Sequence, residues 1–413
     1  MKIYLVGGAI RNKCLNLPVK DKDWVIVGAT PQEVLKLGFK PVGKGFPVFL
    51  HPVTGEEYAL ARTEKKTGKG YTGFTCYTDP NVSLEQDLQR RDLTINAIAC
   101  DEKGNYFDPF NGRKDLECRI LRHVSNSFRE DPLRVLRVAR FAACYAHLDF
   151  TIANETLMLM RSMSKNGELI ELTAERIWKE TELALQSYNP QLYFQVLKQC
   201  NALEKLFPEL ESLYKINSSK LINMGIHTLR SLFLAAQLST QMEIRFATLC
   251  HNFGKLLNTK MASITTPALQ IMNHSSIFLK EDKLIKNFCQ RLRVPNYLQT
   301  FAILANKFHS VVHHIKNLQP CMVIQLFNYI DAWRKPYRIE QLSLVSEVNA
   351  RAYYYPKKIL YSQGEYLRIL FQIAKKISVQ QIIEKGFQGI KINQELSKLR
   401  CQKISKWKKQ QLI

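Results

Sequence analysis

The chain has 413 residues, of which 46% are hydrophobic and 23% are charged, as in globular rather than disordered proteins. Its 59 Lys and Arg outnumber its 36 Asp and Glu, so the formal net charge is +23. This excess favours a polyanionic partner, nucleic acid before membrane, although a Lys-rich genome would also explain it. No apolar stretch reaches the roughly 18 residues that span a bilayer. The ten cysteines form no CxxC pair, so we expect a reduced, cytoplasmic protein.

Two kinds of pattern divide the chain. Short β-rich runs at Ile3–Val6, Trp24–Val27 and Val48–Leu50 alternate with turn residues and predict a small sheet near the N-terminus. From about Asp131, apolar residues recur at spacings of three and four, which predicts helices nearly to the end. Breaks are expected at Pro190, Pro208, Pro267, Pro295, Pro320 and Pro356. The predicted fold class is therefore α+β, with a sheet-containing head and a helical body.

A pair of glycines follows the first predicted strand. Gly7 and Gly8 let the backbone come close to a ligand, and the helix that they open presents free N–H groups to phosphate. Arg11 adds a cation one turn into that helix. A tight strand-to-helix turn would explain the glycines equally well.

Two aspartates precede the second predicted strand. Asp21 and Asp23 are two residues apart, and residues at this spacing in a strand point to one face. Neighbouring carboxylates repel each other unless a cation lies between them, which suits Mg²⁺ ions that hold a nucleoside triphosphate. The alternative is a polar turn, but the preceding Gly-Gly turn favours the metal site.

Arginines recur in two later segments. Arg91 belongs to RRDLTINA (90–97), and Arg137 and Arg140 lie along the helix predicted within REDPLRVLRVARF (129–141). Guanidinium groups grip phosphate oxygens in a bidentate way, although ion pairs that hold the fold are the alternative.

Asp131 and Arg134 begin the predicted helix three residues apart. Asp131 has a simple role available as the helix cap before Pro132. Together, however, the two side chains offer one acceptor and a fork of donors on one helix face. Cytosine and adenine share an amino donor beside a ring-nitrogen acceptor, whereas uracil and guanine carry the reverse pattern. The pair could therefore select C and A without a template.

The motifs resemble those of the class II tRNA nucleotidyltransferases, the CCA-adding enzymes of bacteria, over essentially the whole chain. The resemblance rests on GGAIRN (7–12), KDKDW (20–24), EEYALARTE (56–64), RRDLTINA, EDPLRVLRVARFAA (130–143) and LTAERIWKE (172–180). It implies a polymerase-beta-type nucleotidyltransferase head with a small mixed sheet, followed by an all-α neck, body and tail. The implied segments are a head (1–122), a neck and body (123–221), a degenerate HD-like domain (222–330) and a basic tail (331–413).

The resemblance also implies the reaction. Such an enzyme adds C, C and A to the 3′ end of tRNA from CTP and ATP, releases pyrophosphate, and can add a second CCA to unstable tRNAs. Its implied partners are tRNA, ATP and CTP, with neither a membrane nor a protein partner. The implied site residues are Asp21 and Asp23 for Mg²⁺, Gly8, Arg11, Arg91, Arg137 and Arg140 for the nucleotide, Asp131 and Arg134 for the base, and Glu57 as a candidate third carboxylate.

The HD-like segment has lost metal ligands. Asn252 follows His251 where HD phosphohydrolases have Asp, and an amide is a far poorer ligand for a hard cation than a carboxylate. His227, His274 and His309 remain. We therefore predict a helical segment in which these histidines pack, without metal phosphohydrolase activity.

Two segments and three rival functions stay open. Residues 355–413 hold 13 Lys and Arg against 3 Asp and Glu, which favours an RNA-contact surface over a solvated helix face. Thr63–Gly73 is either a mobile loop over the site or a plain hairpin connection. The rival functions are a poly(A) polymerase with the same head and neck motifs, an HD phosphohydrolase with a decayed head, and a non-catalytic tRNA chaperone.

Overall fold

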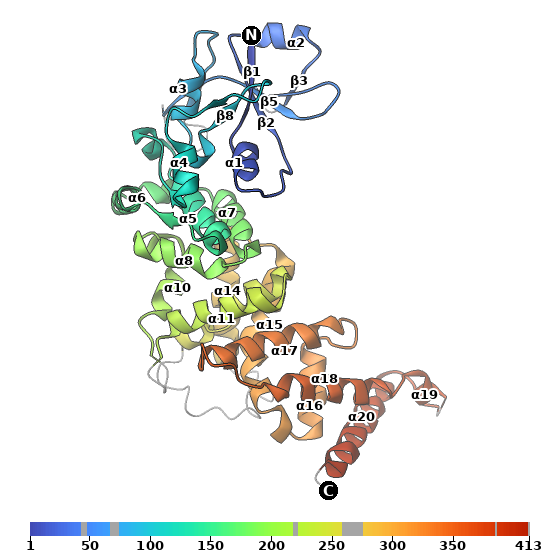
Figure 1. The fold of residues 1–413 in the computed structure, drawn as a ribbon. Helices are drawn as coiled ribbons and strands as arrows, with labels where there is room; N and C mark the ends of the chain where they lie inside the picture. The colour runs from blue at the N-terminus through green and yellow to red at the C-terminus, as the bar shows by residue number, and fades with distance from the viewer. Residues whose placement is uncertain (43–47, 67–73, 218–221, 258–275, 385, 412–413) are drawn as a thin grey trace. The chain divides into compact units, whose positions relative to one another are not determined.

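The computed structural model describes residues 1–42, 48–66, 74–217, 222–257, 276–384 and 386–411. These residues divide into two compact units, Met1–Leu206 and Phe207–Ile413 (Figure 1). The boundary falls inside the predicted neck and body segment. The finer division into four segments stays a prediction.

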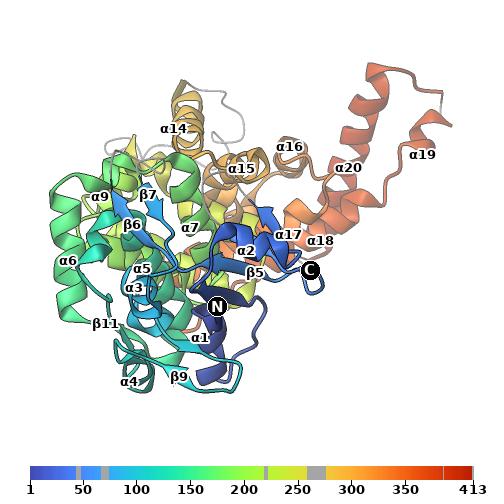
Figure 2. The ribbon, with the colours of Figure 1, turned by 90° about the horizontal axis from the view of Figure 1, so that it is seen from above.

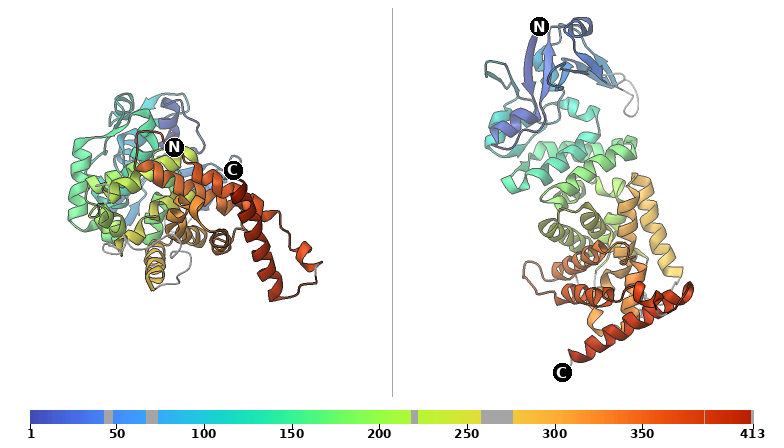
Figure 3. Two further views of the ribbon diagram at one scale, coloured as in Figure 1. Left: turned by 90° about the horizontal axis from the view of Figure 1, so that it is seen from below. Right: turned by 90° about the vertical axis from the view of Figure 1, so that its right-hand side faces the viewer.

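A mixed sheet opens the first unit, and Figure 3 shows it in blue near the N-terminus. Its strand order among the described residues is β3-β4-β5-β2-β1-β8-β9. Strand β5 lies parallel to β2, and the other neighbouring pairs are antiparallel. The three strands predicted from sequence are confirmed as β1, β2 and β4. The bounds are β1 (Lys2–Val6), β2 (Asp23–Val27), β3 (Lys40–Val42), β4 (Val48–Leu50), β5 (Glu57–Leu60), β8 (Ala99–Cys100) and β9 (Tyr106–Phe107).

Both faces of this sheet are apolar, because successive side chains of a strand point to opposite sides. On one face Val6 and Val25 pack against Leu88 of α3 (Leu84–Gln89). On the other face Ile26 packs with Val34 of α2 (Pro31–Lys36). Burial on both sides fixes the register of β1 and β2, and that register sets where their ends, and the residues beyond them, lie.

A separate hairpin consists of β6 (Thr63–Lys66) and β7 (Phe74–Tyr77), which pair in antiparallel fashion (Figure 2). This pairing shows that Thr63–Gly73 includes one strand of a hairpin. Most of that segment, residues 67–73, lies outside the described residues, so the choice between a mobile loop and a plain hairpin connection stays a prediction.

Helices complete the first unit. Helix α5 packs against α7 and α8, and its buried side includes Val135, Val138 and Ala142 at spacings of three and four. The bounds are α1 (Gly8–Cys14), α4 (Gly112–Glu117), α5 (Leu133–Tyr145), α6 (Asn154–Lys165), α7 (Ala174–Gln186), α8 (Pro190–Gln199) and α9 (Leu203–Leu206).

The described part of the second unit is helical. Helix α17 packs against α11, α12, α15 and α18, and α20 packs against α16 and α18. The bounds are α10 (Pro208–Leu213), α11 (Met224–Leu238), α12 (Met242–Cys250), α14 (Ser276–Leu292), α15 (Asn296–His313), α16 (Pro320–Tyr329), α17 (Tyr337–Ala352), α18 (Ser362–Lys375), α19 (Gln380–Ile383) and α20 (Ile390–Gln410).

The predicted breaks at proline are explained by helix starts. Pro190, Pro208 and Pro320 occupy the first turn of α8, α10 and α16, where a missing N–H costs nothing. Pro267 lies outside the described residues. Within the described ranges, no helix is long and apolar enough to cross a membrane.

Candidate active site

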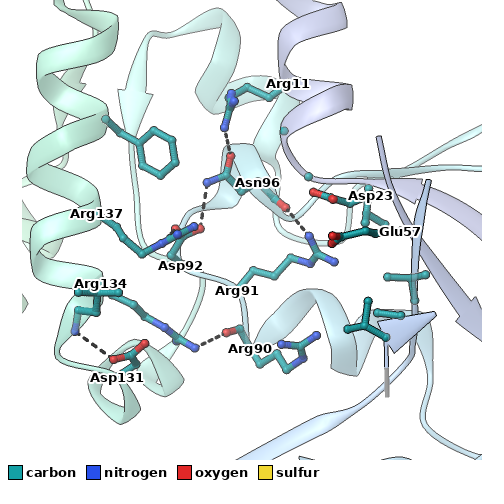
Figure 4. A pocket seen from close by; sticks show the side chains of 18 of the residues that line it. Arg11, Asp23, Glu57, Arg90, Arg91, Asp92, Asn96, Asp131, Arg134 and Arg137 are labelled. Atoms are coloured by element: carbon teal, nitrogen blue, oxygen red, sulfur yellow. Dashed lines mark hydrogen bonds and ion pairs between the residues drawn. The ribbon is translucent and has the colours of Figure 1, made fainter. Parts of the chain in front are cut away.

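A cavity of about 620 Å³ lies in the first unit, where the ends of the sheet strands meet helices α5 and α7. Eight of the predicted site residues line it: Gly8, Arg11, Asp23, Arg91, Asp131, Arg134, Arg137 and Arg140. The candidate third carboxylate, Glu57, also lines it, and Figure 4 shows Asp23 and Glu57 side by side with Arg91 directed toward them. Residues far apart in the sequence therefore share one polar cavity.

The carboxylates of this cavity come from the first residues of two parallel strands. Asp23 begins β2 and lies opposite Glu57, which begins β5. Asp21 lies in the exposed segment before β2, so the expectation that it shares a strand face with Asp23 is wrong. Desolvation raises the pKa of Asp23, Arg91 opposes this shift, and Asp21 adds to it.

Glycine is favoured at the turn into α1 because the backbone of Gly7 has a positive φ, and guanidinium groups lie close to this turn. Gly7 has a φ of 69°, and a Cβ at this position would lie 3.0 Å from Arg91 Nη1. A Cβ on Gly8 would lie 3.4 Å from Arg11 Nη2. The Gly-Gly pair thus brings two arginines against the strand end, which supports a role beyond the turn itself.

A hydrogen-bonded chain orders two of the arginines (Figure 4). Arg11 Nη1 donates to Asn96 Oδ1 at 2.5 Å, and Asn96 Nδ2 donates to Asp92 Oδ1 at 2.9 Å. Arg137 Nε donates to Asp92 Oδ2 at 2.7 Å. Burial alone would raise the pKa of Asp92, but Arg137 and Asn96 outweigh it and hold that pKa well below its ordinary value.

Two further carboxylates hold the other arginines. Buried Asp87 pairs with Arg91 Nη2 at 3.1 Å and also with Arg90. Glu180 of α7 pairs with Arg140 Nε at 2.5 Å. These ion pairs fix the directions of guanidinium groups that would otherwise repel one another.

The predicted base-reading pair is arranged differently from the expectation. Asp131 has extended backbone and precedes α5, and its Oδ1 accepts a hydrogen bond from the N–H of Leu133. Its Oδ2 accepts from Arg176 Nη2 at 2.8 Å. The Arg134 guanidinium donates to the main-chain carbonyls of Ser127 and Arg90, at 2.8 and 2.6 Å. Asp131 therefore has a cap-like role and an arginine partner from α7.

Several residues of this site were not assigned a role from the sequence. They are Asp87, Asn96, Phe141, Arg176 and Glu180, and all except Asp87 and Glu180 line the cavity. Asn96, Phe141, Arg176 and Glu180 stand inside motifs quoted above, so their position in those motifs was the available signal. Their partners depend on packing between segments, which spacing does not reveal.

The second unit contains a different polar cluster. His227, His251 and His309 are at most 6% exposed, and the ring centroids of His251 and His309 are 5.0 Å apart. The rings of His227 and His251 are 6.0 Å apart. His274 lies outside the described residues. Among the residues that are described, no three His, Cys, Asp or Glu side chains are grouped so that they could hold a metal ion.

Asn252 and Asn349 form hydrogen bonds with the ring nitrogens of His227 and His251. His251 Nδ1 lies 2.5 Å from Thr248 O and therefore donates, so its Nε2 accepts from Asn252 Nδ2 at 3.0 Å and Asn349 Nδ2 at 2.8 Å. His227 Nε2 lies 3.1 Å from Asn349 O, which leaves its Nδ1 facing Asn252 Nδ2 at 3.3 Å. This pattern requires neutral imidazoles.

Burial keeps the histidines neutral. Desolvation lowers the pKa of His227 to about 3 and that of His309 to about 3, and it lowers the pKa of His251 well below its ordinary value. His313 extends the cluster, since its Nε2 lies 3.0 Å from Asn349 Oδ1. The region thus contains a buried hydrogen-bonded cluster of neutral imidazoles and amides, in which Asn252 Oδ1 and Thr248 Oγ1 have no hydrogen-bond partner among the described residues.

Family models match two segments of the chain. One lies within the first unit, and the other begins in the first unit and ends just beyond residue 206. Residues 3–122 match the poly A polymerase head domain. Residues 149–214 match the probable RNA and SrmB-binding site of polymerase A.

Solved structures of similar fold cover nearly the whole chain. The CCA-adding enzyme of Bacillus stearothermophilus in complex with CTP is 23% identical, covers 96% of this chain and 87% of its own, and has a TM-score of 0.59. The Thermotoga maritima CCA-adding enzyme complexed with tRNA is 19% identical, with coverages of 98% and 87% and a TM-score of 0.62. A CCA-adding enzyme with ATP is 19% identical, with coverages of 98% and 86% and a TM-score of 0.65. Residues 3–122 are therefore similar to a poly A polymerase head domain and residues 149–214 to the probable RNA and SrmB-binding site of polymerase A, and the chain has a fold similar to that of the CCA-adding enzymes.

Proposed function

We propose that the protein adds and repairs the 3′-terminal CCA of tRNA, using CTP and ATP and releasing pyrophosphate. The observation that carries this proposal is the cavity of the first unit, where carboxylates at strand ends face a wall of arginines. The similar structures with CTP, ATP and tRNA favour this substrate set over an unrelated nucleotide transfer. The place of such a reaction is the cytoplasm, where tRNA is processed.

The carboxylates of the cavity fit a divalent metal. Oxygen donors suit Mg²⁺, and Asp21 is close enough to Asp23 to contribute to the rise in its pKa. Asp21 and Asp23 would hold the metal, and Glu57, directly across the strand pair, is the candidate third ligand. When bound, the metal would supply Lewis-acid stabilisation of phosphate charge.

The residues of the chain position the reactants. The arginines neutralise the triphosphate, and their carboxylate partners keep them fixed before the nucleotide arrives. The 3′-hydroxyl of tRNA loses its proton and attacks the α-phosphate. The new O–P bond forms as the bond to pyrophosphate breaks, so no covalent enzyme intermediate is needed.

Base selection is assigned to Asp131 and Arg134. Arg176 fixes the direction of the Asp131 carboxylate, and main-chain carbonyls fix that of Arg134, so donor and acceptor directions are set in advance. Exchanging the acceptor and donor character of the pair should move the preference from C and A toward U and G. Steady-state kinetics with all four nucleotides test this, and an unchanged preference would return Asp131 to a capping role.

The decisive experiment incubates the protein with tRNA that lacks CCA and supplies each nucleotide in turn. Addition that stops after C, C and A supports the proposal. A long A tail from ATP alone would identify a poly(A) polymerase, which shares the matched head. Binding of tRNA without any addition would identify a tRNA chaperone.

The remaining segments take supporting roles in this proposal. Residues 123–221 recognise the base and bind tRNA, and the basic tail, 331–413, binds tRNA. The HD-like segment, 222–330, is a packing element without phosphohydrolase activity. The hydrogen bonds from Asn252 and Asn349 support this, because they occupy the lone pairs that imidazoles would give to a metal.

An assay of 2′,3′-cyclic AMP and phosphomonoester hydrolysis with Ni²⁺, Mn²⁺ and Mg²⁺ tests the HD-like segment. We expect no metal-dependent turnover. Turnover that disappears in the His251→Ala variant would overturn this part of the proposal.

A further inference from the structure

Arg11 differs from the other arginines of the cavity. Arg91, Arg137 and Arg140 each form an ion pair with a carboxylate. Arg11 forms none within the described part of the chain, and its guanidinium donates to the amide oxygens of Asn96 and Asn12. Desolvation lowers its pKa, and Tyr145 and Asp92 oppose that shift. This cation therefore keeps its full charge for an incoming anion.

Two aromatic rings hold Arg11 instead. Phe141 and Tyr145 are four residues apart on α5, so their side chains lie on one face of the helix. Their rings are nearly parallel, at 5° and 6.0 Å between centroids. The guanidinium carbon of Arg11 lies 5.3 Å from the Phe141 centroid and 5.2 Å from the Tyr145 centroid. Both distances fall in the range of cation–π attraction.

The chemistry of this support matters for a triphosphate. A carboxylate would fix a guanidinium and also cancel its charge, so an arriving phosphate would have to compete with it. An aromatic face attracts the cation through its quadrupole but carries no net charge. Phe141 serves more than one arginine in this way, since the guanidinium carbon of Arg140 lies 4.2 Å from the same ring centroid.

We propose that Phe141 and Tyr145 are positioning residues for triphosphate binding, which hold Arg11 in place without neutralising it. This rests on the proposed nucleotidyl transfer and deepens it. Both side chains are buried, at 5% and 8% exposed. Tyr145 is not among the residues that line the cavity and therefore acts through Arg11, whereas Phe141 lines the cavity beside Arg11 and Arg140. Their loss should weaken the binding of CTP, ATP and pyrophosphate alike and leave base preference unchanged.

The test uses the full chain and inorganic pyrophosphate as the probe, with binding measured by calorimetry and KM measured for CTP and ATP. The Tyr145→Leu and Phe141→Leu variants should each weaken pyrophosphate binding and raise both KM values by about ten-fold. The conservative variants Tyr145→Phe and Phe141→Tyr keep a ring and should stay within about two-fold. Thermal unfolding of each variant identifies samples that fail to fold. If the leucine variants fail to fold, the two conservative variants alone test the inference.

A double-mutant comparison separates this role from general packing. In an Arg11→Gln background, Tyr145→Leu should cause no further loss of pyrophosphate binding, because the ring acts through Arg11. A matched control, Tyr188→Leu, removes a ring that is 57% exposed, does not line the cavity and should have no effect. An equal loss with and without Arg11 would overturn the inference. Pyrophosphate binding that follows this pattern without any CCA addition would overturn only the proposed function.

Discussion

The cavity of the first unit and the histidine cluster of the second both collect polar side chains from distant segments, but they balance charge in opposite ways. In the cavity, ionised Asp92 and Glu180 pair with arginines, and Arg11 is left with aromatic and amide partners. In the cluster, neutral imidazoles pair with the amides of Asn252 and Asn349. The cavity is therefore incomplete until an anion and a cation bind, whereas the cluster pairs imidazoles with neutral amides, although the buried Asn252 Oδ1 and Thr248 Oγ1 have no hydrogen-bond partner in the described part of the chain.

This difference shows how a single residue, Asn252 in place of Asp, can decide whether the neighbouring histidines bind a metal or only form hydrogen bonds. A carboxylate at position 252 would face the lone pairs of His227 and His251 and would need a cation between them. The two hydrogens of Asn252 Nδ2 instead point to His251 Nε2 and Thr228 Oγ1, at 3.0 and 2.9 Å, and His227 Nδ1 lies 3.3 Å from the same nitrogen. Hydrogen bonding thus replaces metal binding without leaving the imidazoles unpaired.

The largest expected effect is on the predicted metal ligands, of which Asp23 lines the cavity and Asp21 lies just before β2. Asp21→Asn and Asp23→Asn should each lower the rate of nucleotide addition by roughly 1,000-fold or more, since each removes an oxygen donor for the cation that stabilises phosphate charge. Filter binding should show tRNA affinity within about two-fold of wild type. Glu102→Gln, an exposed carboxylate of the same unit, is the matched control and should keep full activity. Full activity in both aspartate variants would remove the metal assignment.

The sequence was sufficient to predict many of the elements and residues that form the cavity, but not which side chains of the cavity pair with each other. Strands β1 and β2 and helices α1 and α5 were predicted because alternating or three-and-four spacing depends on nearby residues only. The partnership of Asp131 with Arg176 and of Arg140 with Glu180 joins segments about 40 residues apart. Such partners depend on how α5 packs against α7, which the spacing within either segment does not encode.

The second prediction concerns acid. The pKa values of His227 and His309 are about 3 in the folded protein, against about 6.5 when exposed, and that of His251 is also lowered. Between these values the unfolded chain binds more protons, so stability is complete above pH 6.5 and falls as the pH falls. At pH 5.5 each histidine should cost about 1 kcal/mol, and the cluster about 3 kcal/mol, in the free energy of unfolding.

The contribution of the cavity's carboxylates to stability should change in a lower pH range. Asp87 and Asp92 have lowered pKa values, so their contribution is present above about pH 4 and is lost only below it. Hydrogen exchange at pH 7.5 and 5.5 should therefore show protection lost in the second unit first. The His309→Gln variant should reduce the pH dependence of urea unfolding, whereas His147→Gln, at an exposed position, should not. Equal loss of protection in both units would contradict the comparison.

The third prediction breaks the ionic network itself. Asp92→Asn removes the partner of Arg137 and leaves that guanidinium without its 2.7 Å contact. Because Asp92 is buried and the Arg137 side chain is 37% exposed, we expect a loss of about 2 kcal/mol, less than for a fully buried pair. Urea unfolding measures it. Glu340→Gln breaks an exposed pair with Arg368 and should cost at most about 0.5 kcal/mol.

The basic tail shows that composition alone does not reveal which cations are available to bind RNA. Net charge predicts an RNA-contact surface but treats every cation of α20 alike. Arg400 is 9% exposed, and its guanidinium carbon lies 3.5 Å from the centroid of the Trp333 ring. Lys408 donates to the carbonyls of Lys316 and Leu318, at 3.1 and 2.6 Å. These two cations hold the helix against its neighbours, which no count of charges could reveal.

The smallest expected effect therefore comes from the exposed cations of the tail. Lys403, Lys406 and Lys409 are exposed and three residues apart, so they follow one face of α20. Replacing all three with Gln should weaken tRNA binding by about ten-fold at physiological salt and make the log–log salt dependence shallower by about two. The matched variant Lys408→Gln should lower the melting temperature and leave that slope unchanged, because its ammonium group already binds carbonyls. A wild-type salt dependence of tRNA binding in the triple variant would mean that these three lysines are solvated and contact no phosphate. The contrast between ionic and neutral polar groups would then not extend beyond the cavity to the tail.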